Sequence, residues 1–265
     1  MDYANRMAAE TNARGGLLLC LHIPKTAGTA LADLLTSHFQ PDEIRNIRGP
    51  DYVGAADNLR NASEADKARL RLVYGHFAFG LHEAFTQPCR YYTVLRDPID
   101  RVMSLYYYIR GTTAHPRHLA VRQMTLAEFA LSGLHPEIEN CQTRMLSGRA
   151  ETHFISGAEA CSELDLANAI EHLESGFVDY GLYEDLPRSL FTLCKSMGWK
   201  YTAPISRNVT KARNSVTQLN DEERAALEKV NGFDIRLYEY AKSRFRQAPV
   251  PWTDRLRWKT RRWLG

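Results

Sequence analysis

A segment near the N terminus combines a lysine, two threonines and a glycine in a pattern that suits the binding of phosphate or sulfate. It reads His22-Ile-Pro-Lys-Thr-Ala-Gly-Thr29 and follows a short apolar run. A loop between a buried strand and a helix directs backbone N–H groups and the positive end of the helix dipole at one point. Gly28 lets the backbone approach an anion, and Lys25 adds a full charge. The hydroxyl of Thr26 or Thr29 can donate as well.

This segment is not a Walker loop, because GxxxxGK[ST] does not occur in the chain. The alternative interpretation is a tight strand–helix turn that carries a surface lysine.

A second candidate anion site lies in the segment that runs from Leu95 to Ser104, Leu-Arg-Asp-Pro-Ile-Asp-Arg-Val-Met-Ser. Arg96 is expected at the carboxyl end of a strand, the edge at which open α/β sheets bind ligands. Ser104 lies ~9 Å further along a helix at 1.5 Å per residue, within reach of a shared anion. A guanidinium and a hydroxyl suit a phosphate monoester. A structural ion pair of Arg96 with Asp97 or Asp100 is the alternative.

Alternating strands and helices must position these residues. The apolar run at 16–22 predicts a buried strand, and Leu31, Leu34, Leu35 and Phe39 predict a helix over 29–39. Strands at 70–74 and 91–95 follow, the second leading into a helix from Asp97-Pro98 to about Tyr108. Further predicted elements are helices at 57–72, 126–131, 138–146, 163–174, 186–197, 221–229 and 233–245, a strand at 177–182 and a loop at 111–118.

This order indicates an α/β fold with three layers, a mainly parallel central sheet and additional helices in the C-terminal half. We expect a flexible N terminus at 1–15, one domain at 16–247 and a basic, aromatic tail at 248–265. The tail could lie at an anionic membrane surface, dock on its own domain or on a second subunit of a homo-oligomer, or be disordered.

The composition is that of an ordinary globular protein: 265 residues, a net charge of +3 and 44% hydrophobic residues. Fibrous, disordered and integral membrane classes are excluded, and no nucleic-acid partner is indicated. Five cysteines stand far apart without metal-ligand spacing, so we expect reduced thiols and no metal site. The first sixteen residues lack the apolar core of a signal peptide, which predicts a cytoplasmic protein.

Together, HIPKTAGT and VLRDPIDRVMSLYYY resemble the two signature loops of sulfotransferases that use 3′-phosphoadenosine 5′-phosphosulfate (PAPS), in particular the carbohydrate 2-O-sulfotransferase-like branch. The resemblance spans strand one to Phe245 and implies a P-loop-like domain with PAPS as sulfuryl donor and no metal. It implies that Arg96 and Ser104 bind the 3′-phosphate. The segment that it assigns to the 5′-phosphosulfate consists of Pro24, Lys25, Thr26, Ala27, Gly28 and Thr29. Lys25 would be catalytic, and Ala30 replaces a serine that is frequent in the family.

Three shorter segments also resemble this family. The segment Val73-Tyr-Gly-His76 is similar to the one whose histidine is the general base, which makes His76 the candidate. Glu139 to Leu146 resembles an Asn-x-Gln-x-Arg helix, and the segment around Asn208 resembles a loop that closes over the nucleotide. His22 is expected to fix the first loop by hydrogen bonding. The rival bases are His82, Glu83, Asp51 and Glu43.

The expected activity is sulfuryl transfer to a hydroxyl of a saccharide or glycoconjugate. The loop after the second anion site could bind an anionic saccharide through Arg110, His115, Arg117, His118 and Arg122, or be a solvated surface. Tyr106, Tyr107 and Tyr108 could stack on sugars or serve as packing residues. The alternatives to this activity are an ATP- and magnesium-dependent small-molecule kinase and a non-catalytic anion-binding adaptor at the membrane.

Overall fold

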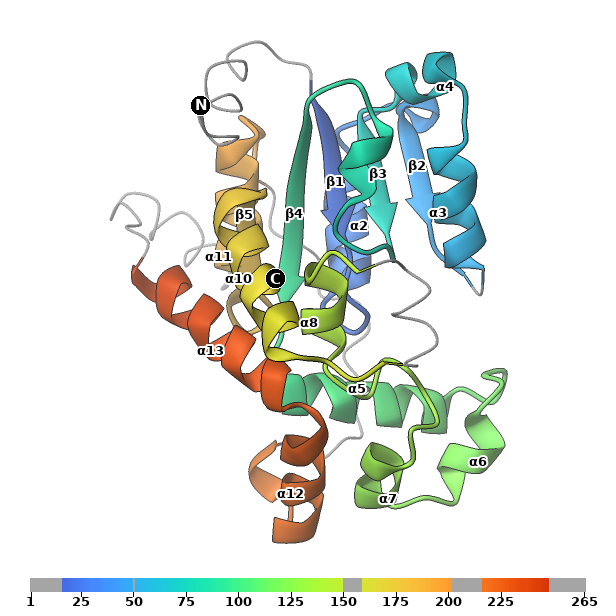
Figure 1. Cartoon of the computed structure of the whole chain (residues 1–265), viewed down its shortest axis with the longest axis vertical. Helices are drawn as coiled ribbons and strands as arrows, with labels where there is room; N and C mark the ends of the chain where they lie inside the picture. Colours follow the sequence, from blue (N-terminus) through green and yellow to red (C-terminus); the bar gives the residue numbers. More distant parts are fainter. Residues whose placement is uncertain (1–15, 50, 150–158, 202–215, 248–265) are drawn as a thin grey trace.

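A five-stranded parallel sheet forms the centre of the molecule, in the order β2-β3-β1-β4-β5 (Figure 1). The computed structural model describes residues 16–49, 51–149, 159–201 and 216–247. The strands are β1 (Leu17–Leu21), β2 (Ile44–Ile47), β3 (Leu72–Gly75), β4 (Cys89–Leu95) and β5 (Phe177–Leu182). The predicted α/β class with helices around a parallel sheet is therefore confirmed. The predicted flexible N terminus and the basic tail lie outside the described residues.

Eleven helices are described within these ranges, together with short 3-10 turns. They are α2 (Gly28–Thr36), α3 (Tyr52–Arg60), α4 (Glu64–Arg69), α5 (Pro98–Gly111), α6 (His118–Arg122), α7 (Leu126–Leu131), α8 (Cys141–Leu146), α10 (Glu163–Ser175), α11 (Leu186–Ser196), α12 (Asp221–Val230) and α13 (Gly232–Gln247). None of the helices in these ranges is both long enough and apolar enough to cross a membrane.

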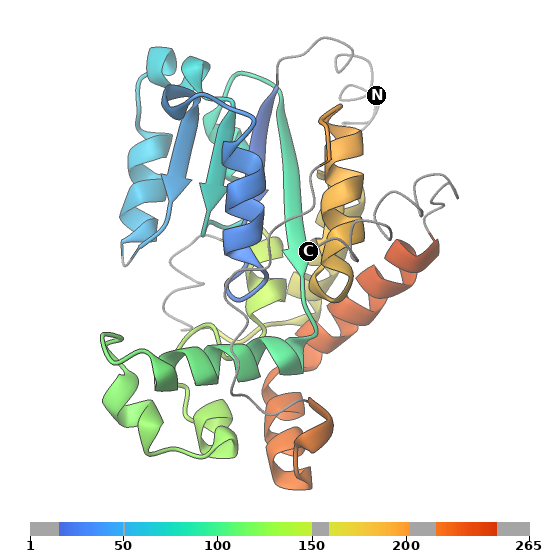
Figure 2. The same ribbon diagram turned by 180° about the vertical axis from the view of Figure 1, so that it is seen from behind.

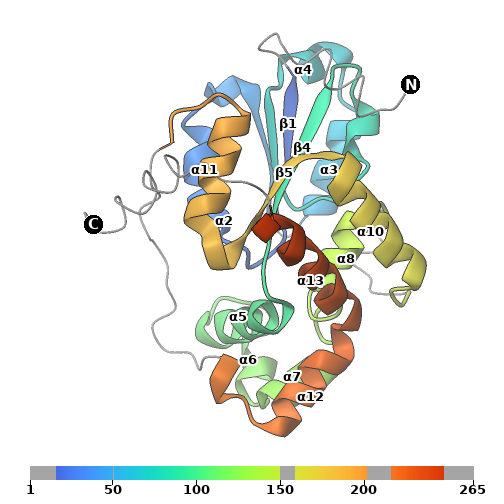
Figure 3. The ribbon, with the colours of Figure 1, turned by 90° about the vertical axis from the view of Figure 1, so that its left-hand side faces the viewer.

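The three layers follow from the side-chain alternation of β1. Leu17, Leu19 and Leu21 enter one apolar core with α3, α10 and α13, whereas Leu18 and Cys20 enter another with α2 and α11. Figure 3 shows α2 and α11 on one side of the strands and α3 and α10 on the other, and Figure 2 shows α2 in front of the sheet. All five β1 residues are fully buried, as expected for a central parallel strand.

A third apolar core lies beyond the carboxyl ends of the strands. Helices α5, α6, α7 and α12 pack there around Val102, Phe129 and Leu227. Helix α5 runs across the arrowhead ends of the strands (Figure 1), and Asp97 caps its N terminus by accepting a hydrogen bond from the backbone N–H of Asp100. The fold therefore places α5 against the carboxyl edge of the sheet, where the candidate site residues are expected to lie close together.

One predicted helix was wrong and one strand was missed, both for local reasons. The single helix predicted at 57–72 is two helices, because the Ser63 hydroxyl accepts from the backbone N–H of Asp66 and starts α4 anew. Strand β2 was missed because it is an edge strand that exposes Arg45 and Asn46 and so has no continuous apolar run.

The region after α5 also differs from the prediction. The predicted loop at 111–118 leads into the short helix α6, which the sequence pattern did not indicate. Helix α8 begins at Cys141 instead of residue 138, because Asn140 adopts a left-handed conformation with φ 43°. The five cysteines are buried free thiols.

Candidate active site

The loop between β1 and α2 has a backbone conformation typical of anion-binding turns. Lys25 and Ala27 have positive φ angles of 71° and 67°, which is unusual for residues with side chains. Thr26 lies buried between them, and its hydroxyl donates to the carbonyl of Ile23 at 2.8 Å. Where residues in the left-handed conformation alternate with right-handed ones, successive backbone N–H groups point to the same side of the loop. This arrangement is the anion-binding nest. The strain of this loop is therefore located where we expect the ligand.

His22 fixes this loop by packing against Gly28. A Cβ atom at Gly28 would lie 2.1 Å from the Nε2 atom of His22, so no larger residue fits without displacing the ring. The Thr26 hydroxyl also lies 3.4 Å from Nδ1 of His22. Burial, the neighbouring His76 and the cations Arg48 and Lys25 hold the pKa of His22 well below its ordinary value. His22 is therefore neutral and packs against the loop, in addition to its contact with Thr26.

Arg96 joins the two candidate anion sites. Its Nη1 donates to the carbonyl oxygen of Lys25 at 2.7 Å, although the residues are far apart in the chain. Its Nε and Nη2 donate to one carboxylate oxygen of Asp100 at 2.9 and 2.6 Å. The guanidinium also lies 4.0 Å from the ring centroid of Tyr183. Arg96 therefore contacts the first loop and also forms the ion pair that was the alternative interpretation.

Ser104 lies on the face of α5 that is turned toward the Lys25 loop. Asp100 and Tyr108 stand four residues before and after it, and residues at this spacing share one face of a helix. Asp100 contacts Arg96, and the ring centroid of Tyr108 lies 4.0 Å from Nζ of Lys25. Ser104 is partly exposed and makes no hydrogen bond with the described parts of the chain. Its hydroxyl is therefore available to a ligand between the two contacts.

His76 extends the site from the neighbouring strand. It follows β3 directly, and its Nδ1 donates to the backbone carbonyl of His22 at 2.8 Å. Because a carbonyl only accepts, this bond places the proton on Nδ1 and leaves the Nε2 lone pair as an acceptor. Burial lowers the pKa of His76. The hydrogen bond to the His22 backbone opposes this shift in part, and the charge of Arg48 adds to it. The geometry thus provides a neutral imidazole with one basic nitrogen.

The rival bases lie in other surroundings. His82 contacts the hydroxyl of Tyr91, a residue paired with Leu19 in the middle of the sheet and not at its carboxyl edge. Glu83 lies beside His82 in the 3-10 turn Leu81–Ala84. Asp51 accepts from Gly54 at the start of α3, and Glu43 accepts from the backbone of Gln40. Asn208 lies outside the described residues, so its predicted role stays a prediction.

Arg48 is a site residue that the sequence reasoning missed. Its Nη2 donates to the carbonyl of Gly28 at 3.1 Å, and its guanidinium lies 4.8 Å from the ring centroid of Tyr74. It follows the missed edge strand β2, which brings it to the carboxyl edge of the sheet. Arg48 and Lys25 bring positive charge to this loop, next to Arg96, whose charge is partly offset by Asp100. This charge distribution suits a ligand with several anionic groups.

The Asn-x-Gln-x-Arg segment holds the site in place. The side chain of Gln142 accepts from the backbone N–H of Arg96 at 3.0 Å and donates to its carbonyl at 2.9 Å. Asn140 accepts from the backbone N–H groups of Phe233 and Asp234 at the start of α13. Asp234 in turn accepts from the backbone of Gln142 and Thr143. These residues fix the backbone from which the Arg96 side chain extends.

We expect Gln142→Leu to lower both stability and nucleotide affinity. The change leaves the buried N–H and carbonyl of Arg96 without partners, at a cost of about 1–3 kcal/mol each. Urea denaturation measures the loss of stability, and titration with adenosine 3′,5′-bisphosphate measures the loss of affinity. Gln142→Glu keeps the acceptor but not the donor, so its stability and nucleotide affinity should lie between those of Gln142→Leu and those of the wild type. Unchanged stability in Gln142→Leu would contradict this role.

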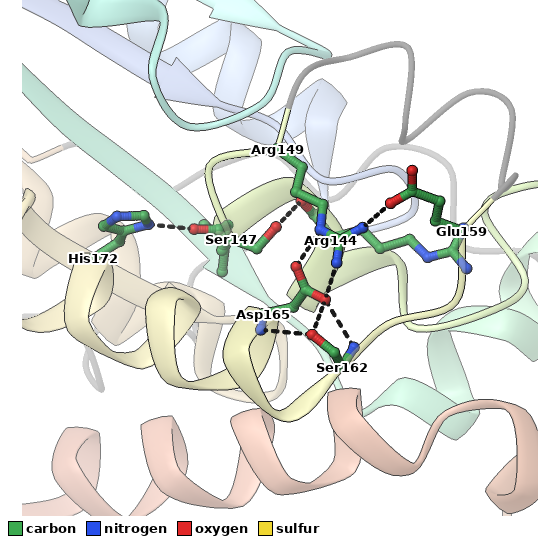
Figure 4. Close-up of polar contacts among 8 residues, drawn as sticks. Arg144, Ser147, Arg149, Glu159, Ser162, Asp165 and His172 are labelled. Carbon is green, nitrogen blue, oxygen red and sulfur yellow. Dashed lines mark hydrogen bonds and ion pairs between the residues drawn. The ribbon is translucent and has the colours of Figure 1, made fainter.

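A second polar network joins the end of α8 to α10 (Figure 4). Arg149 donates through Nε and Nη2 to the two oxygens of Asp165 at 2.5 and 2.8 Å, and through Nη1 to Glu159 at 2.7 Å. Burial alone would raise the pKa of Asp165, but hydrogen bonds from Ser162 and Arg149 outweigh it and lower that pKa. His172 contacts the Leu146 carbonyl at 2.7 Å. This network supports α8, which carries Gln142.

The described residues form an α/β fold in which Arg96 and the Lys25 loop make a candidate anion site at the carboxyl edge of the parallel sheet. The model of the "Sulfotransferase family" matches residues 13–241 of the chain. The chain therefore belongs to the sulfotransferase family, and the family recognised from its two loops is confirmed at that level.

Two curated relatives are similar to part of the chain. Heparan-sulfate 6-O-sulfotransferase 3 of Mus musculus is 27% identical over 192 residues, which cover 63% of this chain and 40% of that protein. The Homo sapiens protein of the same name is 26% identical over the same extent. The chain thus spans 40% of the length of these relatives. The finer placement beside the 2-O branch stays a prediction, since both names denote 6-O enzymes.

Two solved structures resemble the described fold. Mouse sulfotransferase SULT7A1 complexed with PAP has a TM-score of 0.42 and 15% identity, covering 85% of this chain and 67% of that one. A sulfotransferase from Alicyclobacillus acidocaldarius has a TM-score of 0.47 and 13% identity, covering 86% of this chain and 95% of that one.

Proposed function

We propose that the protein transfers a sulfuryl group from PAPS to a hydroxyl of a saccharide or glycoconjugate. The observation that carries this proposal is the hydrogen bond from Arg96 to the carbonyl of Lys25, which brings the two predicted anion sites together. One nucleotide with phosphorylated groups at both ends is the ligand that matches two adjacent cationic sites. Membership of the sulfotransferase family and the similarity to heparan-sulfate enzymes support this choice.

In this proposal the protein aligns the acceptor and neutralises charge on the leaving group. The donor supplies an activated sulfuryl group, and its leaving group is adenosine 3′,5′-bisphosphate. The Lys25 side chain and the backbone N–H groups of residues 25–29 are suited to the phosphosulfate end, because a charged ammonium and several backbone donors lie in one short loop. Arg96 and Ser104 are suited to the 3′-phosphate end. An in-line arrangement requires the acceptor hydroxyl on the side opposite the leaving phosphate.

His76 is the proposed general base. Its neutral ring and the available Nε2 lone pair allow it to accept the proton of the acceptor hydroxyl as that oxygen attacks sulfur. The backbone carbonyl of His22 keeps the Nδ1 proton in place, so the accepted proton goes to Nε2 and the imidazolium stays hydrogen-bonded.

Isothermal titration with adenosine 3′,5′-bisphosphate and with ATP–magnesium tests the proposal. We expect tight binding of the bisphosphate in the presence of a chelator, weak binding of ATP–magnesium, and transfer of label from [35S]PAPS to a polysaccharide. Binding of ATP–magnesium alone would favour a kinase. Binding of the bisphosphate without transfer to any acceptor, and without PAPS hydrolysis, would favour a non-catalytic adaptor.

A further inference from the structure

Beside Lys25, an exposed aromatic ring continues the site toward the loops at 112–118 and 132–138. The Tyr108 ring packs under the Lys25 ammonium at 4.0 Å, yet 46% of Tyr108 is exposed. A large aromatic side chain that is half exposed beside the catalytic lysine is unusual for a packing residue, and such rings bind the apolar faces of sugars. Tyr106, by contrast, is buried in the third core. Tyr107 is partly buried against the same core, so Tyr108 is the exposed tyrosine of this helix and the one placed to contact a ligand beside Lys25.

His115 links Tyr108 to an arginine. Its ring meets Tyr108 edge-on at 5.9 Å, and its Nδ1 accepts from the backbone N–H of Arg117 at 3.2 Å. Because Nδ1 is an acceptor, the neutral ring carries its proton on Nε2 and presents a donor there. Burial, the Arg117 charge and the neighbouring His118 lower the pKa of His115, which keeps the ring neutral.

One nitrogen of the Arg117 guanidinium is fixed by a hydrogen bond, and the other two have no hydrogen-bond partner among the described residues. Its Nε donates to the carbonyl of Leu134 at 2.8 Å, and its Nη1 and Nη2 make no hydrogen bond with the described residues. One fixed nitrogen orients the planar guanidinium, so that the two Nη groups can bind a carboxylate in a bidentate manner. Arg117 is partly exposed, which leaves it accessible.

The charges around this surface favour an anion. Burial raises the pKa of Glu137 to about 7, and the cations that oppose this rise are Arg101, Lys25 and Arg117. A single carboxyl group thus faces three permanent positive charges. Arg101 is completely buried and donates to the Glu137 carbonyl at 2.6 Å, which fixes the loop that also holds Arg117.

We propose that Tyr108, His115 and Arg117 form the acceptor subsite and select a sugar that carries a carboxylate, with the sugar ring on Tyr108 and the carboxylate on Arg117. This inference rests on the proposed sulfuryl transfer and narrows its acceptor to uronate-containing saccharides. It also gives Tyr108 two neighbours, the acceptor and Lys25, so that a bound acceptor lies next to the residue that stabilises the leaving group.

The test combines a change in the protein with a change in the sugar. Heparosan, chondroitin and hyaluronan oligosaccharides, each native and with its carboxyl groups reduced to alcohols, are titrated into the protein saturated with adenosine 3′,5′-bisphosphate. The same sugars serve as acceptors with [35S]PAPS. Arg117→Gln should weaken binding and raise KM about tenfold or more for the native sugar that binds best. Its effect on the reduced sugar should be within twofold, because the carboxylate is already missing.

Tyr108 variants test the stacking contact separately. Tyr108→Ala should weaken binding of native and reduced sugars alike, by about fivefold or more, whereas Tyr108→Phe should bind like the wild type because the ring face is kept. Arg69→Gln removes an exposed arginine at the end of α4 and serves as the control for loss of charge. Thermal melting and bisphosphate binding check that each variant is folded.

Several results would overturn the subsite. The first is that Arg117→Gln weakens the binding of native and reduced sugars equally. The second is that the wild type binds both sugars equally well. The third is that the wild type binds no uronate polymer although it still binds the bisphosphate. In each case the donor site and the proposed function stand. Failure of the wild type to bind the bisphosphate would instead remove the proposed function, and the subsite with it.

Discussion

His76→Ala is expected to reduce sulfuryl transfer by about 10²–10⁴-fold while nucleotide affinity stays within twofold of the wild type. The loss follows from removal of the only basic nitrogen that we assign to the acceptor hydroxyl. Single-turnover transfer from [35S]PAPS measures the rate, and titration with adenosine 3′,5′-bisphosphate measures the affinity.

His76→Asn separates the base from its structural contact. The asparagine amide can still donate to the carbonyl of His22, which His76 does at 2.8 Å, but it has no basic nitrogen. This variant should therefore keep the stability of the wild type and lose transfer as fully as alanine does. If both variants transfer normally and His82→Ala does not, the base is His82.

The pH dependence of transfer has a defined sign in this account. Because burial lowers the pKa of His76 below its ordinary value of 6.5, the neutral base is present at pH 7 and is lost only when the pH falls through the lowered value. The acidic limb of kcat/KM, which reports the groups of the free enzyme, should lie below pH 6.5 in the wild type. An acidic limb above pH 6.5 would not fit a buried His76 as the base.

Lys25→Ala is the second change with a large expected effect, about 10²–10³-fold in turnover with a smaller loss of nucleotide affinity. The charge that develops on the leaving oxygen loses its ammonium partner. The backbone carbonyl of residue 25 can still accept from Arg96, so the loop keeps its anchor. Steady-state kcat with PAPS and the Kd of the bisphosphate measure the two effects.

Lys25→Arg is the matched variant for charge. It keeps the positive charge but replaces a compact ammonium by a planar guanidinium, so we expect partial recovery of affinity and little recovery of turnover. Alanine and arginine variants that both turn over like the wild type would show that Lys25 does not act on the leaving group.

The two strand–loop–helix units could be predicted because their signals are local. The apolar run of β1 is unbroken and buried, and Asp97-Pro98 marks the start of α5 at the correct residue. Once two parallel strands are placed side by side, their carboxyl ends meet. The convergence of Arg96 with the Lys25 loop follows from this topology.

The parts that were missed depend on contacts between distant residues. Arg48 reaches Gly28 only because β2 pairs with β3, and this edge strand has no apolar run to reveal it. The hydrogen bonds from Gln142 to the Arg96 backbone join residues 46 positions apart, and no spacing rule indicates such a pair. The positive φ angles at Lys25 and Ala27 are likewise set by packing, because neither residue type favours them.

Ser104→Ala tests most directly whether one nucleotide spans both anion sites. The Ser104 hydroxyl has no partner within the described residues, so its removal should leave the fold and the Lys25 loop unchanged. The variant is titrated with adenosine 3′,5′-bisphosphate and with 5′-AMP, which lacks the 3′-phosphate. We predict about tenfold or more weaker binding of the bisphosphate and unchanged binding of 5′-AMP. Wild-type affinity for the bisphosphate, or an equal loss for both nucleotides, would contradict the account.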